Sequence, residues 1–349
     1  METITKTVTA ELDAYFQEQT DARRFSGVVL VAKDSTILLE KGYGFANYAT
    51  RQANDPAILY KIGSMTKAFV TLSILMLEER GQLCVDNTLD TYIPGFSFGT
   101  EVTLHQLMSH TSGVWCYLQD PASPFWDVMD RPHTTQDLMG YMKGRPLNFP
   151  PGSQWRYSNS SYVLLGVIIE RFSGEPLGDF FRHNIFEPLG LLNTIFDPSE
   201  SWPPDRLAIG YDHLNLDPPP ISRNLHSSVT YATGAMLSTV GDLYKWDQAL
   251  CAGVQVSKES LNRIFTPGLG NYGYAWWIDS LEVNHQRHKN IWHWGCSSGY
   301  HGMLTRLVDD RATIIMLQNF TSPDLLVPES PEALFRLRNG AAAILFSGE

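Results

Sequence analysis

Apolar and polar residues follow a helical period and then a strand period in the N-terminal part of the chain. Residues 3–19 place Val8 and Phe16 on one side of a helical projection, which predicts an amphipathic helix. Residues 25–32 form an apolar, β-branched run, and residues 37–42 form a second run after a short polar turn. Two such runs joined by a polar turn indicate an antiparallel hairpin.

The most regular helical pattern covers residues 64–80, where apolar positions recur at i, i+3 and i+4, and Gly81 marks its end. Pro and Gly then interrupt the pattern repeatedly from residue 84 to residue 210. Within this part, residues 103–110 and 162–172 are the clearest helices. The middle of the chain is therefore predicted to be mostly helical.

The C-terminal part returns to strands. It is predicted to contain a helix at 238–250, strands at 273–278, 291–295, 301–308 and 312–318, and a last helix at 331–346. This order indicates an α+β fold in which an antiparallel sheet is flanked by the terminal helices. We expect an α/β lobe made of residues 1–83 and 211–349, and an all-α lobe inserted at residues 84–210.

Composition excludes several classes of protein. The 349 residues carry a formal net charge of −11, which argues against nucleic-acid binding. No run reaches the roughly 18–20 apolar residues that a membrane span requires. The first residues lack a basic start and an apolar core, so a cytoplasmic location is expected, or a secreted or periplasmic one if the chain has been shortened. The four cysteines are scattered without a C-x-x-C pair and are expected to be free thiols, so no metal or cofactor is predicted.

The first candidate for chemistry is the pair Ser64 and Lys67 at the start of the predicted helix at 64–80. Residues at i and i+3 share one helix face, with Cβ atoms about 5–6 Å apart. Apolar neighbours are expected to bury the Lys67 stem, and burial favours the neutral amine. A neutral amine beside a hydroxyl is a general base beside a nucleophile. The alternative is that Ser64 is only a helix N-cap.

The second candidate is the loop after the Pro150-Pro151-Gly152 turn, which carries Tyr157 and Asn159. A tyrosine gives or takes a proton, and an asparagine offers an amide donor and an acceptor. The alternative is a loop tyrosine followed by a helix-capping asparagine.

The third candidate is the segment 291–302, in which a strand runs into small residues that let a substrate approach the backbone. Gly295 to Gly299 also fits G-x-S-x-G, the nucleophile elbow of α/β-hydrolases, with Ser297 as nucleophile. That motif requires a helix after it, whereas residues 301–308 are predicted to be a strand. We therefore interpret the match as chance.

Taken together, these segments resemble the serine β-lactamase and penicillin-binding-protein superfamily, in particular its branch of class C β-lactamases, D,D-peptidases and esterases. Ser64 and Lys67 match its S-x-x-K motif, Tyr157 and Asn159 match Y-x-N, and the segment 293–295 stands where lactamases carry K-T-G. The resemblance spans roughly residues 20–345 and implies the β-lactamase/transpeptidase-like fold.

The resemblance also implies roles for these residues. Ser64 would be the nucleophile that the substrate acylates, Lys67 would remove the serine proton, and Tyr157 would shuttle protons to the leaving group and activate the deacylating water.

Further site residues follow from the same resemblance. Asn159 would hold the substrate amide or the lysine, and His293 would orient the tyrosine or pair with a substrate carboxylate. The backbone beside Gly295 would line the cleft, and the N–H groups of Ser64 and Cys296 would form the oxyanion hole. The thiol of Cys296 would be incidental.

Two departures from the family pattern narrow the prediction. A lysine is permanently charged near neutrality, whereas the histidine at position 293 has an unperturbed pKa of about 6.5. Trp294 is also bulkier than the usual threonine. Both favour a D-aminopeptidase-like or D,D-carboxypeptidase-like peptidase, or an esterase, acting on a small-molecule or short-peptide substrate. A true β-lactamase, a non-catalytic penicillin-binding-like sensor and a hydrolase using Ser297 stay as alternatives. His110 is predicted to be a structural, hydrogen-bonding histidine at a helix end.

Overall fold

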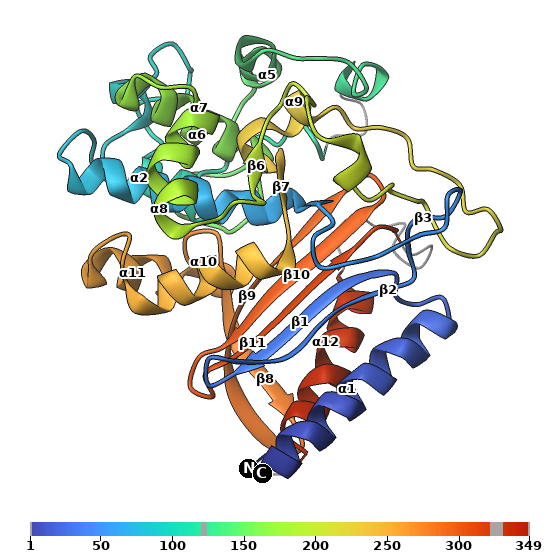
Figure 1. The fold of residues 1–349 in the computed structure, drawn as a ribbon. Coiled ribbons are helices and arrows are strands. Elements are labelled where there is room, and N and C mark those ends of the chain that lie inside the picture. Colours follow the sequence, from blue (N-terminus) through green and yellow to red (C-terminus); the bar gives the residue numbers. More distant parts are fainter. Residues whose placement is uncertain (1, 120–123, 322–330, 348–349) are drawn as a thin grey trace.

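The computed structural model describes residues 2–119, 124–321 and 331–347. Its centre is a six-stranded antiparallel sheet in the order β2-β1-β11-β10-β9-β8. The strands are β1 Gly27–Lys33, β2 Thr36–Tyr43, β8 Trp277–Val283, β9 Gln286–Ser297, β10 Tyr300–Leu307 and β11 Ala312–Gln318. The N-terminal β1 pairs with the C-terminal β11, with Gly27 opposite Gln318 and Lys33 opposite Ala312. The two ends of the chain therefore build one sheet (Figure 1).

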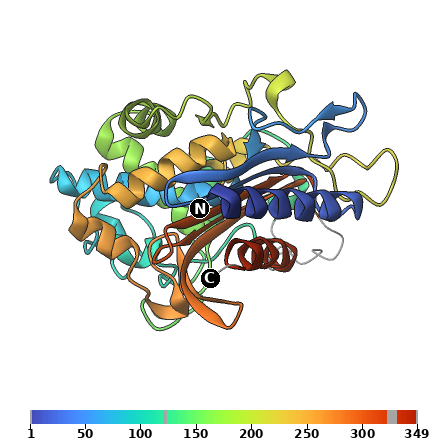
Figure 2. The same ribbon diagram turned by 60° about the horizontal axis from the view of Figure 1, so that its bottom comes forward.

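Both faces of this sheet are covered. The terminal helices, α1 Glu2–Asp21 and α12 Glu332–Leu345, lie on one side of it (Figures 1 and 2). Along β1, Val28 and Leu30 join the core on the opposite side, whereas Val29 joins the core beneath the terminal helices. This alternation explains why a central strand reads as a continuous apolar run.

The other side of the sheet carries α2 Thr66–Glu79, the short 3₁₀ turn Gly63–Met65 before it, and the helical part of the molecule (Figure 1). The other α-helices of the described chain are α3 Leu89–Tyr92, α4 Leu104–Met108, α5 Thr135–Met142, α6 Asn159–Ser173, α7 Leu177–Phe181, α8 Glu187–Leu189, α9 Ser227–Thr230, α10 Val240–Ala252 and α11 Lys258–Ile264. Two small sheets complete the fold, made of β3 Phe45–Asn47 and β4 Gln52–Ala53, and of β5 Tyr60–Lys61, β7 Met236–Ser238 and β6 Ile195–Phe196.

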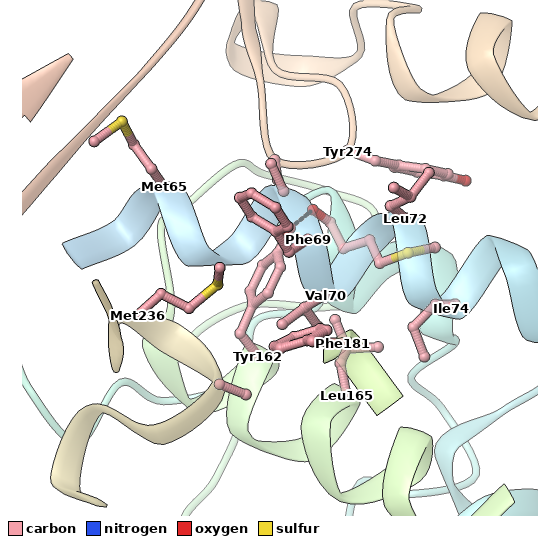
Figure 3. Packing of buried hydrophobic residues seen from close by; sticks show 14 of the residues in the cluster. Met65, Phe69, Val70, Leu72, Ile74, Tyr162, Leu165, Phe181, Met236 and Tyr274 are labelled. Carbon is pink, nitrogen blue, oxygen red and sulfur yellow. Dashed lines mark hydrogen bonds between the residues drawn. The ribbon is translucent and has the colours of Figure 1, made fainter. Parts of the chain in front are cut away.

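Helix α2 lies in the middle of the larger core. Phe69 stacks on Trp246 of α10 with ring centroids 4.0 Å apart. Figure 3 shows Phe69 and Val70 of α2 beside Tyr162 and Leu165 of α6, all of them buried. Apolar residues pack around α2 on all sides. This close packing fixes the position of the helix and of the 3₁₀ turn before it.

The predicted fold class is confirmed: the molecule has an antiparallel sheet, flanking terminal helices and a helical part between its strands. One predicted strand, at 273–278, is wrong, because β8 begins only at Trp277. The residues before it form a turn in which Gly273 N donates to Trp276 O at 2.8 Å and Ala275 has a φ of +64°. The division into lobes at residues 83/84 and 210/211 stays a prediction. Among the described helices, none combines the length and apolar character that crossing a bilayer requires.

Candidate active site

Ser64 and Lys67 lie side by side at the entrance to α2. The Lys67 Nζ is 3.0 Å from Ser64 Oγ and donates to the Thr233 carbonyl oxygen at 2.9 Å. Lys67 has no exposed surface, and this burial lowers its pKa well below the usual value of a lysine. The Thr233 carbonyl is uncharged, so it does not favour the protonated form of Lys67 as a carboxylate would. The geometry therefore places an amine that favours its neutral form against a hydroxyl.

Backbone geometry explains why Ser64 is available. Ser64 belongs to the 3₁₀ turn, and neither this turn nor α2 has a side-chain N-cap hydrogen bond. The alternative of a capping serine is therefore wrong. Gly63 before it has a φ of +51°, and a Cβ there would lie 2.6 Å from Cys296 O. Only glycine fits this close approach of the turn to β9.

Gly295 makes the same approach from the side of β9. A Cβ on Gly295 would lie 1.9 Å from Ile62 O and 3.0 Å from Ser64 N. The two glycines thus bring the backbone of Ser64 and that of Cys296 into contact, as an oxyanion hole shared between these two amides requires.

Tyr157 faces the same amine. Its ring centroid is 4.9 Å from Lys67 Nζ, and its hydroxyl is buried. Burial raises the pKa of Tyr157 well above 10, and the neighbouring Ser64 hydroxyl offsets part of this rise. The tyrosine is therefore a protonated phenol beside the Ser64 hydroxyl.

Asn159 is the first residue of α6, and its described hydrogen bonds go to a cysteine. Its backbone N–H and its side-chain Nδ2 donate to Cys116 Sγ at 3.3 and 3.7 Å. The amide NH₂ of Asn159 is thus engaged by Cys116, and no described hydrogen bond joins Asn159 to Lys67. Cys116 was missed by sequence reasoning, which treated it only as a free thiol.

His293 is fully engaged by two neighbours. Its Nδ1 lies 2.6 Å from Trp294 O, so this nitrogen carries the proton, and its Nε2 accepts from the Tyr272 hydroxyl at 3.2 Å. Burial lowers the pKa of His293 to about 3. The ring is therefore neutral near neutrality and does not titrate there as an unperturbed histidine would. Tyr272 is a second residue that sequence reasoning missed.

The thiol of Cys296 is held beside a histidine. Its Sγ lies 3.1 Å from His301 Nε2, and burial raises the pKa of the thiol to about 12. The neighbouring Ser297 ends β9, and β10 begins at Tyr300, so a strand follows the G-x-S-x-G match. The nucleophile elbow that this alternative needs is not formed.

Aromatic rings enclose the site. Trp155 and Trp277 are half-buried, and the rings of Tyr157 and Trp277 are nearly parallel, with centroids 6.2 Å apart. Tyr272 packs against both tryptophans at 5.7 and 4.9 Å. Within the described ranges, no cluster of three or more His, Cys, Asp or Glu side chains is arranged to hold a metal ion. The walls of the site are therefore largely aromatic and uncharged.

The sequence is similar to those of known proteins. The sequence matches the family described as Beta-lactamase over residues 12–336. It is 31% identical over 331 residues to a penicillin-binding protein of Bacillus subtilis (strain 168), covering 88% of this chain and 71% of that protein. It is 32% identical over 223 residues to esterase EstB of Burkholderia gladioli, covering 60% of this chain and 56% of the esterase.

Solved structures have the same fold. A penicillin-binding protein from Bacillus halodurans superposes with a TM-score of 0.78 at 26% identity, covering 93% of this chain and 99% of that one. The D-amino acid amidase from Ochrobactrum anthropi SV3, complexed with D-phenylalanine, superposes with a TM-score of 0.84 at 22% identity, covering 98% and 99%.

Proposed function

The chain belongs to the beta-lactamase family, and we propose that it is a serine hydrolase that forms an acyl-enzyme on Ser64 with uncharged esters or amides. The membership itself confirms the resemblance that the sequence motifs predicted. The observation that carries the proposal is the 3.0 Å distance between Lys67 Nζ and Ser64 Oγ, together with the complete burial of the Lys67 side chain.

Acylation begins when the neutral Lys67 amine takes the proton of Ser64 Oγ as this oxygen attacks the substrate carbonyl. The carbonyl oxygen becomes an oxyanion, which the backbone N–H groups of Ser64 and Cys296 stabilise; one such donor typically contributes about 3–4 kcal/mol. The bond to the leaving group then breaks, and the leaving group takes a proton from Tyr157. In deacylation, the deprotonated Tyr157 takes a proton from the water that attacks the acyl carbonyl. The bond between this carbonyl and Ser64 Oγ then breaks, and the protonated Lys67 returns its proton to Ser64 Oγ, which regenerates the serine and the neutral amine.

Two features support an uncharged substrate. The resemblance assigns the cation of K-T-G to position 293, where the neutral ring of His293 has both nitrogens occupied by Trp294 O and Tyr272. A substrate carboxylate therefore finds no counter-ion at that position, which disfavours a true β-lactamase. One relative is named an esterase. We propose a small-molecule or short-peptide ester or amide, with an apolar acyl group that packs against Trp155 and Trp277.

The test compares wild type, Ser64→Ala and Ser297→Ala on p-nitrophenyl esters and on N-acetylated amino acid amides, both of them uncharged. The intact protein mass is measured after incubation with a fluorophosphonate. We expect Ser64→Ala to lose activity about a thousandfold or more and to take up no probe. Ser297→Ala should retain both activity and labelling. Activity that survives in Ser64→Ala and disappears in Ser297→Ala would overturn the proposal. Ligand binding without turnover by any variant would favour the sensor instead.

A further inference from the structure

His110 is an unusual residue for a structural position. It has no exposed surface, and its backbone lies in the left-handed region with a φ of +59°. For a residue other than glycine this conformation is unfavourable, and asparagine tolerates it better than most. It directly follows Ser109, the C-cap of α4. Such strain persists where the surrounding contacts require it.

Those contacts converge on Tyr157. The His110 carbonyl oxygen accepts from Arg156 N at 2.9 Å, and its side-chain Nδ1 accepts from Ser158 N at 3.2 Å. One residue thus binds the peptide N–H groups on both sides of the tyrosine. The left-handed turn is what presents the backbone and side-chain acceptors of His110 to the same short segment.

The ring of His110 makes a further contact with the same tyrosine. Its centroid lies 4.2 Å from that of the Tyr157 ring, and the rings of Tyr272 and Tyr162 close the pocket at 5.0 and 5.2 Å. Because a peptide N–H only donates, Nδ1 is unprotonated and Nε2 carries the proton of a neutral ring. Burial and the nearby Lys67 lower the pKa of His110 well below its usual range, in agreement with a neutral ring.

We infer that His110 is the positioning residue of Tyr157: it fixes the two flanking amides and the ring plane, and so directs the phenol oxygen toward Ser64 and Lys67. The inference rests on the proposed function, in which Tyr157 transfers protons. The two described hydrogen bonds that His110 accepts from the segment 156–158 flank Tyr157, so we expect the main effect of His110 to pass through this tyrosine.

The first experiment separates the hydrogen bond from packing. His110→Leu keeps most of the apolar volume but removes the Nδ1 acceptor, whereas His110→Asn keeps an acceptor and tolerates the left-handed backbone but leaves a cavity. A misplacement of about 1 Å can cost about a hundredfold in rate, so we expect His110→Leu to lower kcat by about 10- to 100-fold with KM little changed. His110→Asn should recover most of that loss. A leucine variant more active than the asparagine variant would overturn the inference.

The second experiment is a double-mutant cycle with Tyr157→Phe, which removes the phenol oxygen. If His110 acts through that oxygen, His110→Leu costs little further kcat in the Tyr157→Phe background. If it acts only through folding, the two losses multiply, and the inference fails. His288→Leu is the matched control, because His288 is also buried and stacks on an aromatic ring, that of Phe346, at 4.3 Å. It should lower the melting temperature without changing kcat.

Three possible results of these experiments are distinguished. If His110→Leu does not fold, His110→Ala takes its place in the cycle with the same expectation. If Tyr157→Phe and Ser64→Ala both leave activity unchanged, the proposed function has failed rather than the role of His110. If both abolish turnover of amides, activated esters supply the residual rate on which the cycle is read.

Discussion

At the scale of single residues, the protonation of Lys67 controls the proposed chemistry. Burial lowers its pKa, but below that pKa the amine is charged and accepts no proton from Ser64. We therefore expect kcat/KM to be high above the lowered Lys67 pKa and to fall as the pH decreases through it. The titration of His293 should not change kcat/KM near neutrality, because the pKa of His293 is about 3. The measurement is kcat/KM from about pH 5 to about pH 9 on an uncharged ester.

The control for this profile is Lys67→Arg. A guanidinium keeps its charge throughout the range, so the variant should be inactive at every pH. An arginine variant that is active in this range contradicts the assignment of Lys67 as the base.

Sequence spacing predicted the pairing of Ser64 with Lys67. The predicted helix at 64–80 begins as a 3₁₀ turn and becomes α2 only at Thr66, but residues three positions apart lie on one side of either kind of helix. Sequence spacing did not predict that Tyr272 binds His293, since these residues belong to different elements and meet only through the tertiary fold. It also missed Cys116, which reaches Asn159 from a loop 43 residues earlier. A sequence pattern predicts contacts between residues a few positions apart, whereas contacts between distant loops depend on the tertiary fold.

At the scale of elements, the contact between β9 and the 3₁₀ turn before α2 decides whether the two proposed oxyanion amides face one cavity. Gly295→Ala would place a methyl group 1.9 Å from Ile62 O, so β9 must move away. We expect kcat to fall by about a hundredfold or more, the cost typical of one lost oxyanion donor, with a lower melting temperature.

Gly140→Ala is the matched control for this substitution. Gly140 lies within α5, and a Cβ there meets nothing within 4 Å. Alanine should stabilise the exposed helix by about 0.5–1 kcal/mol and leave kcat unchanged. Wild-type turnover by Gly295→Ala would show that the close approach of β9 is not required.

The pattern of apolar residues did not predict the full length of β9. The apolar run predicted a strand at 291–295, whereas β9 covers Gln286–Ser297. Its polar first half pairs with β8, with Gln286 opposite Val283 and Lys289 opposite Ser280. Backbone pairing extends an edge hairpin regardless of side-chain polarity, so the apolar run underestimates it. The bounds of α6 were predicted more closely, as 162–172 against the observed Asn159–Ser173, because its apolar face is continuous.

At the scale of the whole molecule, the sequence pattern predicted an antiparallel sheet with terminal helices but not the order of its strands. Pairing of β1 with β11 joins residues nearly 300 positions apart, such as Gly27 and Gln318. No local pattern specifies such a pairing; the family resemblance supplied the expectation of the fold. The apolar run of β1 nevertheless indicates a strand covered on both faces, as the two cores show.

A buried ion pair ties the helical side to this sheet. Arg306 Nε of β10 lies 2.5 Å from Asp247 Oδ1 of α10, and both side chains are almost fully buried. Thr313 of β11 donates to Asp247 Oδ2 at 2.7 Å. Asp247→Ala leaves the arginine charge buried and unpaired, so we expect the free energy of unfolding to fall by about 3–5 kcal/mol.

Replacing both partners tests whether the cost comes from the unpaired charge. Asp247→Leu combined with Arg306→Met removes both charges, and the free energy of unfolding in urea should recover most of the loss seen for Asp247→Ala. Asp13→Ala is the control, because Asp13 pairs with Lys41 at the surface and should cost less than about 1 kcal/mol. If the double variant is as unstable as Asp247→Ala, the pair acts through specific packing between α10 and the sheet, and the charge argument is wrong.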